Sequence, residues 1–258
     1  MSGSVSFDRA ADYYDQTRAF PDDVMAGLIP MLMALLPTGE RCLEVGVGTG
    51  RIALPVMAEG VRLIGVDISR EMLRKLIHKA GGAAPPLAIA DATRLPFRGD
   101  TFGSAIAAHV LHLIPGWRSA VDELIRVVRP GGAVIASRGG SSRAEWQHAV
   151  RRRFFVEAGN PAWPPGMDRI EELDSEMTAR GAIVRELPEL RTDDASSINE
   201  LLSALETGIW SACWTMDTAT RMRAAATTRE WAQNELGDLD LARPTSYSST
   251  WRAYVLGK

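Results

Sequence analysis

The stretch Leu43-Glu44-Val45-Gly46-Val47-Gly48-Thr49-Gly50-Arg51 decides the fold that we predict for this chain. A short apolar strand ends near Val45, and a helix is predicted to begin near Arg51. The glycines between them allow positive φ angles and let a ligand approach the main chain closely. The free N–H groups at the start of the helix add a partial positive charge. The stretch therefore predicts a ligand-binding loop at the end of a strand.

The spacing of the three glycines indicates which kind of ligand the loop accepts. Dinucleotide-binding loops carry G-x-G-x-x-G, whereas here Arg51 takes the last position and Gly50 makes the pattern G-x-G-x-G. This spacing is less suited to a pyrophosphate, and it favours a ligand that combines a nucleoside with an amino acid. A glycine loop alone is weak evidence, because glycines also serve purely structural turns.

On both sides of this loop, short apolar runs alternate with amphipathic ones from residue 41 to residue 137. Strands that alternate with helices of roughly 10–15 residues predict βαβ units. The continuous apolar character of the runs fits strands that are buried on both faces. We expect an α/β fold with a doubly wound, Rossmann-like, mostly parallel sheet. Its last strand should be antiparallel, and added helices should make up most of the C-terminal half.

Two acidic residues close the next two predicted strands. Asp67 ends the strand Leu63-Ile64-Gly65-Val66-Asp67, and Asp91 ends Leu87-Ala88-Ile89-Ala90-Asp91. Open α/β sheets bind ligands at the carboxyl ends of their strands, where Asp67 can accept hydrogen bonds from both hydroxyls of a ribose. Asp67 has an alternative role as the N-cap of the helix that starts near Ser69. Asp91 can accept from an exocyclic amino group or cap a turn.

Composition narrows the classes of protein that fit. The 258 residues include 29 basic and 32 acidic side chains, for a net charge of −3, which counts against a nucleic-acid partner. Two cysteines, Cys42 and Cys213, are too few for a disulfide framework or a four-ligand zinc site. The N-terminus shows no signal-peptide pattern, and the longest apolar run, 24–36, is too short to span a membrane. We expect a cytoplasmic protein with no membrane partner and no metal, and we find no signal of an oligomeric state.

Taken together, residues 41–137 resemble the class I S-adenosylmethionine-dependent methyltransferases, in particular the group similar to the ubiquinone/menaquinone-biosynthesis methyltransferases. The resemblance rests on Glu44 to Gly50, on Gly65-Val66-Asp67, on Asp91-Ala92-Thr93-Arg94-Leu95-Pro96-Phe97 and on the turn Arg129-Pro130-Gly131-Gly132. The segment Phe7-Asp8-Arg9-Ala10-Ala11-Asp12-Tyr13-Tyr14-Asp15 is similar to the N-terminal helix of that group. This combination of motifs is specific for the cofactor and gives almost no information about the molecule that accepts the methyl group.

The resemblance implies S-adenosylmethionine as the cofactor and assigns residues to its parts. Gly46, Gly48 and Gly50 would line its methionine moiety, and Glu44 would orient its ammonium group. Asp67 would hold the ribose hydroxyls.

The remaining residues would contact the adenine and close the site. Asp91 would bind the adenine amino group, while Ile68 and Ala92 would pack on the base. Tyr14 and Arg18 lie where the N-terminal helix of this group closes over the cofactor. Arg18 would pair with the cofactor carboxylate, or else be a solvated surface side chain.

We expect a single domain, 1–258, because no segment rich in Pro, Gly or Ser separates two parts. Within it, 1–37 is an N-terminal helical lid and 38–140 is the cofactor-binding core. Residues 141–244 form acceptor-side helical insertions around a sheet strand, with one helix over about 195–215, and 245–258 is the final strand.

Methyl transfer from a sulfonium needs positioning and, for some acceptors, removal of a proton. His109 and His112 follow the fourth predicted strand at the ligand-bearing edge and are the candidate bases, hence the candidate catalytic residues. Their alternative roles are packing against the cofactor for His109 and a structural hydrogen bond for His112.

Aromatic residues in the C-terminal half are candidates for the acceptor pocket. Trp210 and Trp214 are four residues apart, on one face of the predicted helix, where they either pack in the core or line an apolar lid. Trp163 lies in the loop 160–166, a candidate gate. The strand-end sequence Ala107-Ala108-His109-Val110 lacks the Asn- or Asp-Pro-Pro-aromatic motif of enzymes that methylate amino groups of nucleic-acid bases.

These observations predict a methyltransferase that acts on an O, N or C centre of a small, largely apolar molecule. Two alternatives stay open at this point. One is a protein that binds S-adenosylmethionine without catalysis, and the other is a methyltransferase for RNA or protein.

Overall fold

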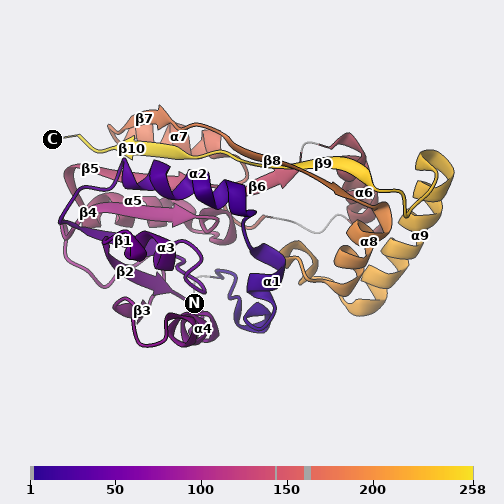
Figure 1. Ribbon diagram of the computed structural model, residues 1–258, viewed down its shortest axis with the longest axis horizontal. Coiled ribbons are helices and arrows are strands. Elements are labelled where there is room, and N and C mark those ends of the chain that lie inside the picture. Colours follow the sequence, from indigo (N-terminus) through magenta and orange to yellow (C-terminus); the bar gives the residue numbers. More distant parts are fainter. Residues whose placement is uncertain (1–2, 143, 160–163, 258) are drawn as a thin grey trace. The chain divides into compact units, whose positions relative to one another are not determined.

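The computed structural model describes residues 3–142, 144–159 and 164–257. The chain divides into two compact units (Figure 1). The first, which we call the sheet unit, comprises Met1–Gly139, Pro165–Leu190 and Thr250–Lys258. The second, the helical unit, comprises Gly140–Pro164 and Arg191–Ser249. The single domain over 1–258 stays a prediction, which one cooperative unfolding transition would support.

The sheet unit is built on a seven-stranded sheet in the order β3-β2-β1-β4-β5-β10-β7. Its strands are β1 (Arg41–Val45), β2 (Arg62–Asp67), β3 (Leu87–Ile89), β4 (Phe102–Ala108), β5 (Val128–Ser137), β7 (Ile183–Glu186) and β10 (Arg252–Val255). The strands β1 to β5 pair in parallel, while β10 is antiparallel to both β5 and β7. The predicted doubly wound sheet with an antiparallel last strand is confirmed.

The order of the strands places a switch point between β1 and β4. From β1 the chain runs outward through β2 to β3, then returns to β4 on the other side and continues outward to β5. Crossover connections therefore diverge at the carboxyl ends of β1 and β4, which is where open α/β sheets bind ligands. All residues of β4 are buried, as expected for a central strand.

Helices of the sheet unit follow from local sequence signals. They are α1 (Tyr14–Arg18), α2 (Asp22–Met33), α3 (Ala53–Ala58), α4 (Arg70–Ala80), α5 (Trp117–Val127) and α7 (Ile170–Ala179), with the 3-10 helices η1 (Asp8–Ala10) and η2 (Leu111–Leu113). In α5, Trp117, Ala120, Val121 and Leu124 recur at helical spacing and are buried in the core of the sheet. Gly81 ends α4 with a φ of 55°.

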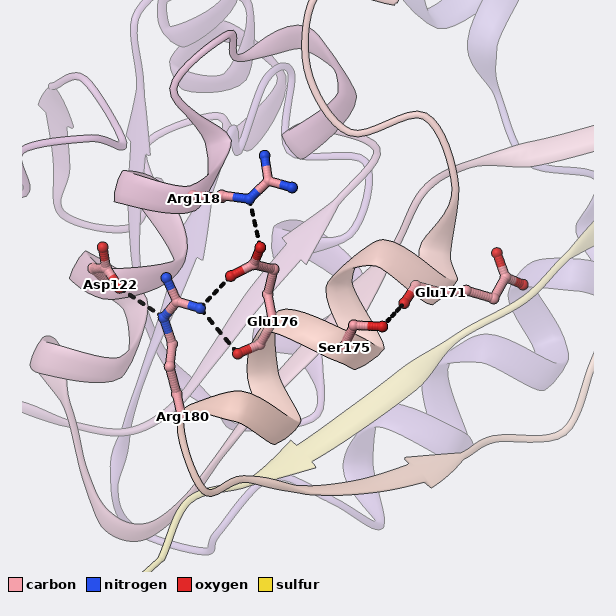
Figure 2. Close-up of polar contacts among 6 residues, drawn as sticks. All are labelled: Arg118, Asp122, Glu171, Ser175, Glu176 and Arg180. Atoms are coloured by element: carbon pink, nitrogen blue, oxygen red, sulfur yellow. Dashed lines mark hydrogen bonds and ion pairs between the residues drawn. The ribbon is translucent and has the colours of Figure 1, made fainter.

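An ion-pair network joins α5 to α7 at the surface (Figure 2). Arg118 of α5 donates to Glu176 of α7 over 2.5 Å, and Arg180, just after α7, donates to Asp122 of α5 over 2.7 Å. Arg180 also pairs with Glu176, so the two arginines share one carboxylate. Shared pairs of this kind fix the two helices side by side, although exposed ion pairs contribute little stability each.

The helical unit contains a three-stranded sheet and a helical core. The sheet has the order β6-β9-β8, with β6 (Gly140–Ser142), β8 (Leu190–Ser196) and β9 (Arg243–Ser249). The helices are α6 (Glu145–Glu157), α8 (Ile198–Thr207), η3 (Ser211–Cys213) and α9 (Thr218–Leu236). Ser197 caps α8 together with Glu200 in a capping box.

Two local predictions for the C-terminal half are wrong. The helix predicted over about 195–215 ends at Thr207, because Gly208 adopts a left-handed φ of 73°. The final strand predicted over 245–258 consists of parts of two strands, β9 and β10, which belong to different sheets. Among the residues described, we find no helix whose length and apolar character would allow it to cross a membrane.

Candidate functional site

The glycine loop between β1 and α3 has the backbone geometry that its sequence predicts. Gly46, Gly48 and Gly50 have φ angles of 70°, 56° and 79°. The Gly46 amide donates to the Val66 carbonyl oxygen over 2.8 Å, which holds the loop against β2. A Cβ atom at Gly46 would lie 2.6 Å from Cγ2 of Val110. A side chain is therefore excluded at Gly46 both by φ and by space.

Glu44 lies in β1, two residues before the first glycine of this loop, and is the most unusual acid of the site. Its side chain is 3% exposed, and Oε2 has no hydrogen-bond partner among the described residues. The pKa of the carboxyl group is raised to about 8, chiefly by burial; Arg51 opposes this increase, and the nearby Asp67 adds to it. A buried carboxyl oxygen without a partner fits a cationic ligand group such as an ammonium.

Asp67 ends β2 and is bound by backbone amides. Its Oδ2 accepts from Gly48 over 2.9 Å, and its Oδ1 accepts from Ser69 over 2.8 Å. The cap of α4 is Ser69, whose hydroxyl oxygen accepts from the Met72 amide over 3.1 Å, so the alternative of Asp67 as the N-cap is wrong. Asp67 thus links the glycine loop to the start of α4, beside the position expected for a ribose.

Asp91 follows β3 and caps a turn, one of the two roles predicted for it. Its Oδ1 accepts from both the amide and the hydroxyl of Thr93, over 2.9 and 2.8 Å. Ile68 is 38% exposed at the end of β2, and Ala92 is buried. An exposed isoleucine beside Asp67 provides an apolar surface on which a flat ring could pack, and the adenine contact of these residues stays a prediction.

The N-terminal segment is held against this edge by carboxylates. Asp8 accepts from the Ser69 hydroxyl over 2.6 Å, at the start of α4. Asp15 accepts from the Thr49 hydroxyl of the glycine loop over 2.6 Å and pairs with Lys79 of α4 over 2.7 Å. The segment that the sequence predicts as a lid therefore contacts both elements that carry the predicted cofactor residues.

Arg51 was not predicted as a site residue, yet it connects several that were. Its Nη1 donates to the carbonyl oxygen of Arg18, and its Nη2 lies 3.1 Å from Nδ1 of His109. The guanidinium carbon lies 4.0 Å from the ring centroid of Phe20 and 5.9 Å from that of Tyr14. The one signal in the sequence was its position directly after the last glycine of the loop.

His109 directly follows β4 and His112 lies in η2; both residues are half-buried, and Nε2 of His109 and Nδ1 of His112 are buried atoms. His109 has a left-handed φ of 56°, and its amide donates to Ser137 over 2.8 Å. Burial and the cations nearby, Arg51 first, hold the pKa of His109 well below its usual range. Burial lowers the pKa of His112 to about 3, and the cations Arg138 and Arg18 lower it too. Both imidazoles are therefore weak bases in this protein, which counts against their role as proton acceptors.

The tryptophans predicted for the acceptor pocket lie in a different local structure from the one expected. Trp210 and Trp214 flank the short helix η3 and do not share one helix face. Trp214 donates to the Gly208 carbonyl oxygen over 3.0 Å, and the guanidinium of Arg151 lies 4.5 Å from the Trp210 ring centroid. Their place in a pocket stays a prediction, and Trp163 lies outside the described residues.

Comparison with protein families gives one match over the core of the sheet unit. Residues 43–136, from β1 to β5, match the family described as a methyltransferase domain. The matched segment contains the glycine loop, Asp67, Asp91 and both histidines.

Relatives and solved structures extend the likeness beyond this segment. A demethylmenaquinone methyltransferase of Streptomyces avermitilis is 32% identical over 163 residues, which cover 62% of this chain and 68% of that protein. A phosphatidylethanolamine N-methyltransferase of Cereibacter sphaeroides is 39% identical over 101 residues, 38% of this chain and 49% of that protein. The chain spans about half the length of the curated relatives that it matches first. The crystal structure of the YcgJ protein of Bacillus subtilis has the same fold, with a TM-score of 0.61, 16% identity, and 89% and 97% of the two chains covered.

Proposed function

The chain belongs to the class I S-adenosylmethionine-dependent methyltransferases, and we propose that it transfers a methyl group from S-adenosylmethionine to a small, largely apolar molecule. The observation that carries the proposal is the buried Glu44 with its unpartnered Oε2 atom, at the end of the strand that leads into a loop of left-handed glycines. This arrangement offers a counter-charge and main-chain space for the methionine moiety of the cofactor.

The residues present fit this cofactor part by part. Gly46, Gly48 and Gly50 leave the main chain open where side chains cannot fit. Glu44 would bind the ammonium group, and Asp67 would bind the ribose hydroxyls with the lone pairs that its two backbone contacts leave free.

The cofactor supplies an electrophilic methyl group when it is bound, so the protein has to orient the acceptor and exclude water. The contacts of Asp15 with Thr49 and Lys79 close the N-terminal segment over the glycine loop. Phe20, which follows this segment and is buried, packs edge-on against His109 at 5.3 Å and adds apolar surface near the end of β4. These side chains support an enclosed site in which an apolar acceptor is favoured.

The names of two relatives support an acceptor with a large apolar part. They are named for a demethylmenaquinone and for a phosphatidylethanolamine, so relatives of this chain differ in the acceptor that they take. The methylated centre is accordingly an O, N or C atom within this proposal. Binding without catalysis, and methylation of RNA or protein, are the alternatives.

Calorimetric titration with S-adenosylhomocysteine tests the cofactor half of the proposal. We expect saturable binding to the wild type, a loss of at least about tenfold in Asp67→Ala, and unchanged binding in the control Asp122→Ala on the far helix α5. No binding to the wild type, or full tolerance of Asp67→Ala, would refute it. Mass-detected methyl transfer to phenols, quinones, amines and carboxylates then tests the acceptor half.

A further inference from the structure

Positive charge gathers at the carboxyl end of β4. Arg51 reaches Nδ1 of His109 over 3.1 Å, and it has no ion-pair partner among the described residues. Arg138 directly follows β5, whose Ser137 accepts from the His109 amide, and it pairs with Asp168 over 3.5 Å. The carbonyl oxygen of Arg18 accepts from Arg51. All three arginines depress the pKa of His109, and no carboxyl group is among the charges that act on it.

The contact with Arg51 determines which nitrogen of His109 carries the proton. A guanidinium N–H can only donate, so Nδ1 has to accept, and the proton of the neutral ring is on Nε2. His109 therefore has no lone pair left with which to remove a proton. Instead, it presents an N–H donor.

That donor is buried and has no partner. Nε2 of His109 makes no hydrogen bond among the described residues. The centroid of the ring lies 5.3 Å from that of Phe20 and 6.5 Å from that of Trp251, so aromatic rings as well as the Arg51 guanidinium surround it. A buried donor without a partner is costly, and a bound acceptor atom with free lone pairs would remove that cost.

We propose that the atom of the acceptor molecule that takes the methyl group is an oxygen that is already ionised when it binds, a carboxylate or an acidic phenolate, and that Arg51 and His109 bind it. This inference rests on the proposed methyl transfer and names its substrate class, an apolar molecule with one acidic oxygen. Arg51 supplies the positive charge, and its contact with Nδ1 keeps the proton of the His109 ring on Nε2. From there, His109 donates a hydrogen bond to the oxygen.

The chemistry needs no base with such an acceptor. A lone pair of the oxygen forms the new bond to the methyl carbon, the carbon–sulfur bond breaks, and its electron pair stays on sulfur. The negative charge of the oxygen and the positive charge of the sulfonium cancel, so no proton has to leave. A site whose two histidines are weak bases is suited to this reaction and unsuited to an ammonium or an alcohol acceptor.

Pairs of probes with the same shape and different charge test the proposal. Octanoate and octanamide, and benzoate and benzamide, are titrated by calorimetry into the protein saturated with S-adenosylhomocysteine. We expect each carboxylate to bind at least about tenfold tighter than its amide, because a charged hydrogen bond is replaced by a neutral one.

Variants then assign the effect to residues. Arg51→Gln should abolish the preference for the carboxylate, and it should weaken the binding of S-adenosylhomocysteine less than it weakens the binding of the carboxylate. The matched control is Arg118→Gln, since Arg118 also lies over an aromatic ring, 4.4 Å from the Trp117 centroid, but pairs with Glu176 and is not among the charges that act on His109. His109→Gln keeps an N–H donor and should keep the preference, whereas His109→Leu should lose it.

Several results would overturn the inference. They are equal binding of carboxylate and amide, binding of neither, a preference that survives Arg51→Gln, and loss of the preference in His109→Gln. A loss of S-adenosylhomocysteine affinity in Arg51→Gln as large as the loss for the carboxylate would assign Arg51 to the cofactor instead. Failure of the wild type to bind S-adenosylhomocysteine would refute the proposed function as well, so the two failures are distinguishable.

Discussion

Replacing Glu44 by glutamine tests whether the buried carboxyl group at the end of β1 is held neutral. Glutamine has nearly the same shape and cannot ionise. We expect the variant to be more stable than the wild type at neutral pH. We also expect it to bind S-adenosylhomocysteine more weakly, because the carboxyl group can release its proton and balance the ammonium charge of the ligand, whereas the amide cannot ionise.

The size of the stability effect follows from the pKa of Glu44. Burial raises it from 4.5 to about 8 in the folded protein. Between these values the folded protein keeps a proton that the unfolded chain has released, so the free energy of unfolding falls as the pH rises, by about 1.4 kcal/mol per pH unit. The contribution is fully present below the lower pKa and lost above the higher one. Glutamine removes this loss. The difference in the free energy of unfolding between the variant and the wild type, which we call the gap, should therefore widen by about 3 kcal/mol from pH 5 to pH 8.

Urea unfolding of both proteins at a series of pH values measures this gap, and other titrating groups cancel in the difference. Glu40→Gln is the control, because Glu40 is exposed and its pKa is lowered by the hydrogen bond from Arg129. Its gap to the wild type should not widen between pH 5 and pH 8. A gap for Glu44→Gln that is the same at every pH would show that Glu44 is ionised in the folded protein, and the reasoning would be refuted.

Three further predictions concern the loop, the histidines and the surface. Gly46→Ala places a Cβ atom 2.6 Å from Cγ2 of Val110 and should weaken S-adenosylhomocysteine binding at least about tenfold in calorimetry. Gly81→Ala is the control, because Gly81 also has a positive φ but has open space around it; it should lower the free energy of unfolding by about 1–2 kcal/mol and leave binding intact. An equal loss of binding in Gly46→Ala and Gly81→Ala would contradict the steric argument. His112, with its pKa lowered to about 3 by burial, should show no titration between pH 5 and pH 8 in NMR spectra, and a midpoint in that range would disprove its burial. Glu176→Gln should lower the free energy of unfolding in denaturant by less than about 1 kcal/mol, and less still in high salt, because the network that it breaks is only partly buried and solvent reaches it. A larger, salt-independent loss would mean that the network is not screened by solvent.

Much of the fold and half of the site follow from short-range patterns. The glycine loop follows directly after an apolar strand, and Asp67 and Asp91 each close another. Because parallel strands all present their carboxyl ends at one edge, such residues come together whatever the rest of the chain does. These local signals were enough to predict the sheet and the cofactor class, while the residues assigned to the cofactor stay a prediction.

The chemistry of the acceptor side depends on contacts that no local pattern encodes. Arg51 and His109 are 58 residues apart, and their contact determines the tautomer and the basicity of the histidine. His109 looks like a base in the sequence, because the type of residue and its position at a strand end suit that role. In the folded chain, burial and neighbouring cations make it a donor instead.

The sequence by itself determined the sheet, the glycine loop and the acids at the strand ends, because helix and strand periodicity and glycine spacing are local properties. Only the tertiary structure decided where the helix at 198–207 stops, how the last segment divides between two sheets, and which charges surround His109 and His112. The physical reason is that burial and electrostatic fields are sums over residues distant in the chain, and they exist only once the chain has folded.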